Sequence, residues 1–255
     1  MTSGQLVLLD IFSYSCMNCL RSLGFIKKID SRYKKHGLKT ALIHPPEWEF
    51  EKEKRNILHF SKKYGIRFPI IMDKEKKIIN KLGISFWPAQ ILIKNGKILY
   101  KNVGDGNYKK LENSISQFLR IKNKGIFSAE PEYSKFPTLY CGKRKNGKLM
   151  NLKNRLRFGI IYKNGKWAQK DEYLKSNGKL SSLTMLTKGK VINFVAKSMS
   201  KKSVNVDVKL NGKLIKRLAI KQPQLYEIIK LKADDQQKLD LTANKRLAVY
   251  SFSFR

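Results

Sequence analysis

Two cysteines separated by two residues, Cys16 and Cys19, are the part of this sequence best suited to chemistry. They follow an apolar run over residues 5–12 that predicts a buried strand, and they open a pattern over residues 19–36 that predicts an amphipathic helix. Two Cys in a first helical turn lie close enough for a disulfide. The free N–H groups and partial positive charge of a helix N-terminus stabilise a thiolate, the nucleophile in thiol–disulfide exchange. We therefore expect Cys16 to be the exposed attacking thiol and Cys19 the sheltered resolving thiol.

Two other interpretations of the pair are a metal half-site and an inert pair. Zinc takes four ligands, usually with a second Cys or His pair at a matching spacing. The remaining candidates are Cys141, which stands alone, and His36, His44 and His59, which are scattered. The redox interpretation is therefore favoured, and no metal or cofactor is expected. Cys141 is expected to be a free, partly buried thiol, with an additional redox or interchain role as the alternative.

Asp10 is the first residue expected to assist the cysteines. It stands six residues before Cys16, inside the apolar strand. Burial penalises an ionised carboxylate, so its pKa should be raised. A carboxylate of raised pKa can take the proton from Cys19 when a mixed disulfide is resolved. The alternative is an ordinarily solvated Asp at a strand end.

Pro88 is the second residue expected to assist the cysteines. Trp87-Pro88 precedes an apolar run over residues 89–93, and Asn95-Gly96 then joins that run to residues 97–103 as a hairpin. We expect the Trp87–Pro88 bond to be cis, since cis peptides are essentially confined to proline. A cis Pro88 facing the cysteines would block metal capture and expose backbone groups to an extended substrate. The alternative is a trans proline that starts a strand.

Strand and helix patterns alternate over the first 124 residues. Further strands are expected at 38–44 and 68–72, and further helices at 47–64, 74–82 and 107–122. In the helix at 47–64 we expect Phe50, Ile57, Leu58 and Phe60 to point inward. Such alternation predicts a mostly parallel sheet with right-handed crossovers, closed by the antiparallel hairpin.

The pattern changes in the second half of the chain. Residues 125–155 are irregular and are interpreted as a linker or an ordered wrap. Short strands and Asn-Gly turns follow, which predicts an all-β antiparallel sandwich of jelly-roll type over residues 156–255. The strands are expected at 157–162, 191–197, 204–210, 214–220, 226–231, 238–241 and 247–254.

Composition and charge exclude several classes of protein. With 42% hydrophobic residues the chain can form a core, which excludes wholesale disorder. No apolar run approaches the roughly 18 residues that span a bilayer, and residues 1–5 do not begin a signal peptide. The chain is therefore expected to be either cytoplasmic or part of a longer protein. The net charge is 54 − 19 = +35, but it is spread over both halves and is mostly lysine, so no specific nucleic-acid partner is expected.

An Asp six residues before a Cys-x-x-Cys pair, with a later x-Pro, hairpin and helix, resembles the thioredoxin fold. The extra helix and strand over residues 47–72 are similar to the insertion of TlpA-like thioredoxins, which work outside the cytoplasm. The sequence of residues 12–21, 44–52 and 86–89 is similar to that of the soluble part of DipZ-type thiol:disulfide interchange proteins, which are linked to cytochrome c biogenesis. The fold class expected is thus an α/β thioredoxin-like domain with an inserted helix–strand unit, over residues 1–124, followed by the sandwich.

The resemblance implies an extracytoplasmic protein-disulfide oxidoreductase, in the periplasm or on the outer face of the membrane. Its substrates would be disulfide-containing exported proteins such as apocytochrome c, and a membrane-embedded donor would supply electrons. Tyr14, Met17, Asn18 and Trp87 are then expected to contact the substrate. Glu47 is expected to border the site with no role beyond shaping the cleft.

The closing part of the chain resembles the carbohydrate-binding-module-like sandwich that follows the thioredoxin domain in DipZ-type proteins. The resemblance rests on Trp167, on the stretch at 223–226 and on residues 249–254. Trp167, Tyr173 and Tyr226 could form a platform for a glycan, but core packing is the favoured interpretation. The alternative function is therefore a glycan- or protein-binding module with a thioredoxin scaffold.

Overall fold

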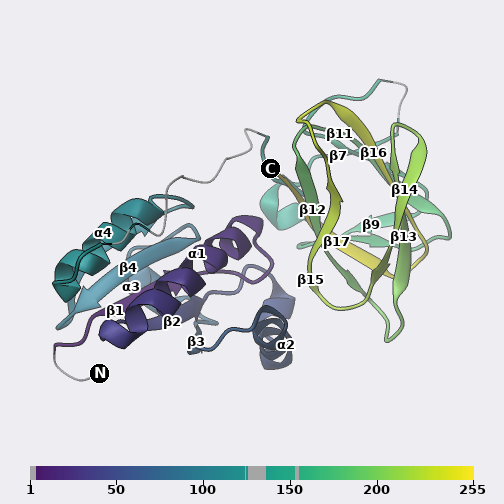
Figure 1. Cartoon of the computed structure of the whole chain (residues 1–255). Helices are drawn as coiled ribbons and strands as arrows, with labels where there is room; N and C mark the ends of the chain where they lie inside the picture. The colour runs from purple at the N-terminus through teal and green to yellow at the C-terminus, as the bar shows by residue number, and fades with distance from the viewer. Residues whose placement is uncertain (1–3, 124, 126–135, 153–154) are drawn as a thin grey trace. The chain divides into compact units, whose positions relative to one another are not determined.

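The computed structural model comprises two compact units, residues 1–131 and 132–255 (Figure 1). The residues that the structure describes are 4–123, 125, 136–152 and 155–255. The boundary expected near residue 124 and the start of the expected linker therefore lie mostly outside the described residues. Within them, no helix is long and apolar enough to cross a membrane.

The first unit is a five-stranded sheet with the strand order β3-β2-β1-β4-β5. Its strands are β1 (Val7–Ile11), β2 (Lys39–His44), β3 (Ile70–Met72), β4 (Ala89–Lys94) and β5 (Lys97–Val103). The strands β1, β2 and β3 run parallel, and the hairpin of β4 and β5 pairs antiparallel to β1. This arrangement confirms the thioredoxin-like α/β fold.

Helices cover both faces of this sheet. They are α1 (Met17–Tyr33), α2 (Lys54–Tyr64), α3 (Lys77–Lys81) and α4 (Tyr108–Leu119), with 3-10 turns η1 (Lys34–His36) and η2 (Glu49–Lys52). Leu8 of β1 packs in one core with Ile26 of α1 and Ile115 of α4, whereas Leu9 packs in another core with Ile79 of α3. All five positions of β1 are therefore buried, which explains its unbroken apolar sequence.

The structure corrects the helix expected at 47–64. Glu53 is extended, with φ −77° and ψ 114°, and it separates η2 from α2. Ile57 and Phe60 are buried as expected, but Leu58 is 58% exposed. Because α2 begins only at Lys54, its narrow buried face holds residues three apart, and Leu58 lies off that face.

The second unit is a sandwich of two six-stranded sheets, which confirms the second part of the fold class. One sheet has the order β15-β12-β17-β10-β9, with β6 paired to β17, and the other has the order β14-β13-β16-β11-β8-β7. The bounds are β6 (Leu139–Tyr140), β7 (Leu149–Asn151), β8 (Ile161–Asn164), β9 (Trp167–Gln169), β10 (Leu174–Ser176), β11 (Ser181–Thr187), β12 (Val191–Ser198), β13 (Val204–Leu210), β14 (Lys213–Ile220), β15 (Gln224–Lys230), β16 (Gln237–Ala243) and β17 (Leu247–Phe254), with a 3-10 turn η3 (Lys143–Lys145). Strand pairing is antiparallel except between β7 and β8.

Several strands of the sandwich were not expected from the sequence. The strands β9, β10 and β11 lie where no strand was expected, and β6 and β7 lie within the expected linker or wrap of residues 125–155. Because β6 pairs with β17 and β7 pairs with β8, the described part of that segment belongs to the sandwich. In β11, Ser181, Thr184 and Thr187 are buried and donate hydrogen bonds from their hydroxyls. These polar residues are the reason that the sequence pattern did not indicate a buried strand here.

Candidate active site

The two cysteines lie at the N-terminus of α1, where Cys16 is the N-cap residue. Cys16 is partly exposed and Cys19 is fully buried, and both thiols are free. The Sγ atom of Cys16 accepts a hydrogen bond from the backbone N–H of Cys19 at 3.4 Å. The Cys16 N–H in turn donates to the carbonyl oxygen of Ser13 at 3.1 Å, which closes a tight turn before the helix. The cysteines are thus placed asymmetrically, with Cys16 alone facing solvent.

Burial raises the pKa of the Cys19 thiol well above its usual value, and the hydrogen bond and charge of Cys16 and the charge of Asp10 add to this effect. Cys19 therefore keeps its proton until a base removes it. This arrangement suits a resolving thiol.

Asp10 is the group that the sequence suggested as that base, and its charge acts on Cys19. Its side chain is fully buried in β1, on the same face as Leu8. Oδ1 accepts a hydrogen bond from Gln90 Nε2 at 2.9 Å, whereas Oδ2 has no hydrogen-bond partner within the described part of the chain. Burial raises the pKa of Asp10 to about 7, and the charge of Asp105 adds to this effect, although hydrogen bonds from Gln90 and Ser22 oppose it. A carboxyl of this pKa exchanges its proton readily near neutral pH.

A ladder of polar side chains crosses three strands beside Asp10. Gln90 lies opposite Asp10 in the β1–β4 register, and Asn102 lies opposite Gln90 in the β4–β5 register. Gln90 Oε1 accepts from Asn102 Nδ2 at 2.9 Å, and Gln90 Nε2 also donates to Ser22 Oγ of α1 at 3.2 Å. Neither Gln90 nor Asn102 was singled out from the sequence, although a Gln just after Pro88-Ala89 in an apolar strand is a detectable signal.

An ion pair holds α1 to the loop that precedes α4. Arg21 Nε donates to Asp105 Oδ2 at 2.5 Å, and the hydroxyl of Tyr108 donates to the other oxygen of Asp105. Arg21 also donates from Nη2 to Asn18 Oδ1 at 3.1 Å. Asn18 and Met17, both expected to contact substrate, are partly exposed between the two cysteines, and the Asn18 side chain is oriented by Arg21.

The Trp87–Pro88 peptide bond is cis, as the sequence indicated. Ala89 lies opposite Ile11, the last residue of β1. Pro88 therefore lies at the end of the sheet where the chain leaves β1 toward Cys16. Trp87 is partly exposed at this edge, and its Nε1 donates to Glu47 Oε2 at 3.4 Å. Glu47 thus borders Trp87, in keeping with the expected place beside the site.

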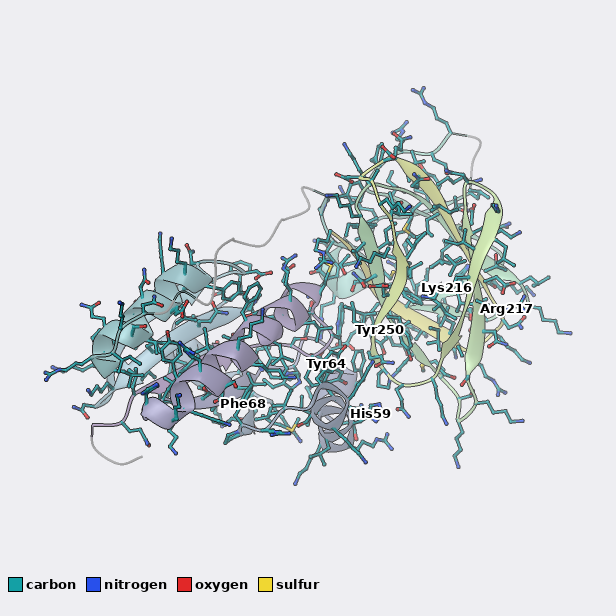
Figure 2. The ribbon with its side chains drawn as sticks, in the orientation of Figure 1. His59, Tyr64, Phe68, Lys216, Arg217 and Tyr250 are labelled. Carbon is teal, nitrogen blue, oxygen red and sulfur yellow. The ribbon has the colours of Figure 1, made fainter. Side chains whose placement is uncertain are left out.

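Tyr14 does not suit the substrate contact expected of it. Its side chain is 2% exposed. Its ring centroid lies 5.4 Å from those of His44 and Phe60, and 6.0 Å from that of Phe50. This aromatic cluster extends along α2 to Tyr64, whose ring lies 4.6 Å from that of Phe60. Figure 2 labels Tyr64. Tyr14 is therefore a packing residue beneath the turn, because three aromatic neighbours cover its ring.

Glu51 belongs to the site and was not singled out from the sequence. It is fully buried at the end of η2, and its carboxylate accepts hydrogen bonds from Ser13 and Ser15 of the turn before Cys16. Burial raises the pKa of Glu51, and the charge of His44 opposes the rise. Glu47, Glu49 and Glu51 look alike in the sequence, and only the 3-10 turn directs the last of them inward.

The aromatic residues considered for a glycan platform are used in packing. Trp167 Nε1 donates to the carbonyl oxygens of Asn164 and Ser182 at 3.0 and 3.1 Å, and its ring packs on the sandwich core. Tyr226 packs on the same core and donates its hydroxyl to the Gln222 carbonyl at 2.7 Å. The ring of Tyr173 lies 5.2 Å from that of Tyr250. The favoured core interpretation therefore fits these three side chains.

Cys141 is a free thiol in the sandwich core, 0% exposed. Burial raises the pKa of this thiol far above its usual value. It is therefore more deeply buried than expected, and in this position its thiol is protonated and shielded from solvent. Among the described residues, no group of three or more His, Cys, Asp or Glu side chains could hold a metal ion.

Comparisons with known proteins show what this chain is similar to. Residues 144–254 match the family described as the thioredoxin like C-terminal domain. The chain is 31% identical over 137 residues to protein DipZ of Mycobacterium bovis, an alignment that covers 53% of this chain and 20% of the relative. It is 25% identical over 115 residues to the thiol-disulfide oxidoreductase ResA of Bacillus anthracis, which covers 45% of this chain and 64% of the relative. The crystal structure of StoA from Bacillus subtilis is similar with 18% identity and a TM-score of 0.38, covering 44% of this chain and 84% of the other.

The fold is thioredoxin-like, with a Cys-x-x-Cys pair at the start of α1, and the chain is similar to thiol-disulfide oxidoreductases such as ResA. More particularly, the chain is similar to a region of DipZ, with a thioredoxin-like N-terminal part followed by a C-terminal β-domain. The chain spans about a fifth of the length of the DipZ relatives.

Proposed function

We propose that this chain reduces disulfides of exported proteins by dithiol–disulfide exchange at Cys16 and Cys19. The observation that carries the proposal is the asymmetry of the pair. Cys16 is partly exposed at the N-cap of α1, whereas Cys19 is buried and the charge of Asp10 acts on it. Attack requires an accessible thiol at a positive helix end, and resolution requires a protected thiol beside a base.

In the first step, the Cys16 thiolate attacks one sulfur of a substrate disulfide. A mixed disulfide forms between Cys16 and the substrate, and the other substrate sulfur leaves as a thiolate that takes a proton from solvent. Cys16 is partly exposed at the N-cap of α1, where a substrate disulfide can reach its sulfur. An extended substrate segment would lie along the chain at cis Pro88, where Trp87 and Glu47 border the approach.

In the second step, Asp10 accepts the proton of Cys19, and the resulting thiolate attacks Cys16 Sγ. The Cys16–Cys19 disulfide forms, and the second substrate sulfur leaves as a thiolate and is protonated. Two electrons have then passed from the chain to the substrate. Asp10 is suited to this transfer because its pKa of about 7 lets it accept a proton and release it again at neutral pH.

The partners and the compartment are part of the same proposal. We propose exported proteins, apocytochrome c among them, as substrates on the outer side of the membrane, as the resemblance to DipZ-type proteins implies. A membrane-embedded donor would return two electrons to the Cys16–Cys19 disulfide after each cycle. Without such a donor the chain could act only once.

The experiment that tests the proposal is equilibration of the chain against mixtures of reduced and oxidised glutathione, with the Cys16–Cys19 disulfide quantified by mass spectrometry. We expect a reversible disulfide with a potential near that of thioredoxin, about −270 mV, as a reductase needs. Cys16→Ser and Cys19→Ser are the controls, and neither should form it. A potential near about −120 mV would reverse the direction to oxidation, and a pair that never closes would refute the redox function.

The glycan-binding alternative has no specific support in the sandwich. Trp167 and Tyr226 satisfy their polar atoms internally and pack on the core. We therefore propose no glycan ligand for this unit.

A further inference from the structure

Glu51 is a buried carboxylate whose hydrogen bonds go to the turn that carries the attacking thiol. Oε1 accepts from Ser13 Oγ at 2.7 Å, from Ser15 Oγ at 2.6 Å and from the Ser15 N–H at 3.3 Å. Oε2 accepts from the Glu47 N–H at 2.6 Å. Four donors from two segments far apart in sequence therefore converge on one side chain.

These contacts restrain the turn at both of its ends. Ser13 accepts the N–H of Cys16 on its carbonyl oxygen, and Ser15 directly precedes Cys16. With the two serines held by Glu51, the backbone leading into the N-cap has little freedom. The position of Cys16 Sγ over the Cys19 N–H depends on that backbone.

The two buried carboxyls beside the dithiol differ in their surroundings. Asp10 leaves Oδ2 without a hydrogen-bond partner in the described part of the chain, so this oxygen is open to a proton. Glu51 has donors on both oxygens, and a proton on it would displace one of them. Environments this different indicate different roles for two carboxyl groups.

We propose that Glu51 is a positioning residue for thiol–disulfide exchange, which holds the turn from Ser13 to Ser15 in the form that presents Cys16 to a substrate disulfide. This inference rests on the proposed function and adds a residue to it. Nearby His44 is also buried, and it donates from Nδ1 to the Phe12 carbonyl at 3.0 Å, which supports the turn from β2.

The test measures the attack step alone. In a Cys19→Ser background, the reduced chain is mixed with oxidised glutathione at pH 7, and the rate of mixed-disulfide formation at Cys16 is followed by mass spectrometry. Glu51→Gln, Ser15→Ala and the double variant are compared. Gln keeps the size of Glu, but its NH₂ group cannot accept, so at least one contact is lost. We expect a rate about tenfold slower than the parent in each single variant and the same loss, about tenfold overall, in the double variant, because both changes release the same restraint.

The matched control is Glu112→Gln, which removes another buried carboxylate from the same unit. Glu112 lies on α4 and accepts from the Tyr33 hydroxyl at 2.8 Å, at the end of α1 away from Cys16. It should keep the parent rate, and circular dichroism should show every variant folded. A role in folding alone would not slow the exchange of a folded chain.

Two results would overturn the inference. One is a parent-like rate in Glu51→Gln and in Ser15→Ala, and the other is single effects that multiply in the double variant. Should Glu51→Gln not fold, Ser15→Ala decides alone, because it removes only a hydroxyl. If the parent chain forms no reversible Cys16–Cys19 disulfide, the proposed function fails and this inference with it. If that disulfide forms while the variants exchange normally, only the role of Glu51 fails.

Discussion

At the scale of single residues, the site depends on where burial places each proton. Cys19 and Asp10 are both fully buried, and burial favours the protonated form of each. Gln90 donates a hydrogen bond to only one oxygen of Asp10, so this contact offsets only part of the effect of burial on the carboxyl. The buried base costs stability when it ionises, and that cost can be measured.

The stability of the chain should fall with rising pH because of Asp10. Its pKa is about 7 in the folded chain against 3.8 ordinarily, so between these values the folded state holds a proton that the unfolded state has lost. The stability that protonated Asp10 contributes to the folded chain is fully present below about pH 4 and is lost as the pH rises through about 7. In Asp10→Asn it disappears, and the free energy of unfolding should fall less steeply, by up to about 1.4 kcal/mol per pH unit.

Urea unfolding of both chains at several pH values between 4 and 9 measures this difference. Asn suits the test because its Oδ1 can still accept from Gln90. Glu53→Gln is the control, since that side chain is 58% exposed and should leave the parent slope unchanged. Parallel pH curves for the parent and Asp10→Asn would contradict a raised Asp10 pKa.

Which site residues the sequence could predict depends on how local their surroundings are. The partial exposure of Cys16 and the burial of Cys19 follow from their order at the start of one helix, so the sequence pattern was enough to predict their placement. The contact between Asp10 and Gln90 joins residues 80 apart, and strand register alone creates it. Tyr14 is adjacent to the cysteines in sequence but turns under them, because α2 supplies aromatic neighbours that no local pattern reveals.

At the scale of elements, the sequence again predicted those parts of the fold that a local pattern marks and missed the others. The α/β part was predictable because its strands are continuous apolar runs and its helices are periodic. The strands β9 and β10 have three residues each, and β11 is rich in Ser and Thr, so neither length nor polarity marked them. The turn η3 is joined to the sandwich by backbone contacts, since Arg144 donates its N–H to the Asp171 carbonyl oxygen at 2.8 Å.

Two glycines of these elements should respond oppositely to alanine. Gly24 lies exposed inside α1 with nothing within 4 Å of an added Cβ, so Gly24→Ala should stabilise the chain by about 1 kcal/mol. At Gly142 an added Cβ would lie 2.3 Å from the Asp171 carbonyl oxygen and 2.6 Å from Glu172 Cα. Both are backbone atoms, so Gly142→Ala should destabilise the second unit by about 3 kcal/mol.

Thermal or urea unfolding of the two variants, each against the parent, checks both signs in one experiment. The exchange rate of Cys16 serves as the control for Gly142→Ala, since that glycine lies in the other unit and should not alter the dithiol. Equal and small effects at both positions would contradict the close backbone approach at Gly142.

At the scale of the whole molecule, the net charge of +35 acts on both units. Residues 1–124 carry 25 basic and 10 acidic residues, and residues 125–255 carry 29 and 9, so the charges are +15 and +20. Acidic partners are few, although Asp207 pairs with Arg217 of β14, where Lys216 adds a further positive charge (Figure 2). The guanidinium of Arg217 holds the pKa of Asp207 below its usual value. Most lysines therefore repel one another across a compact surface, which opposes folding.

Salt should consequently stabilise this chain. Between 10 and 200 mM NaCl the screening length falls to about 10 Å or less, so repulsion between distant lysines is removed. We expect the melting temperature at pH 7 to rise by about 3–6 °C, which corresponds to about 1–2 kcal/mol for a chain of this size. Differential scanning calorimetry at both concentrations measures the rise. Repeating it near pH 10, close to the isoelectric point of about 10.1, provides the control, because the net charge and the salt effect should both nearly vanish there. A melting temperature at pH 7 that is flat or falls with salt would show that the lysines do not repel enough to matter.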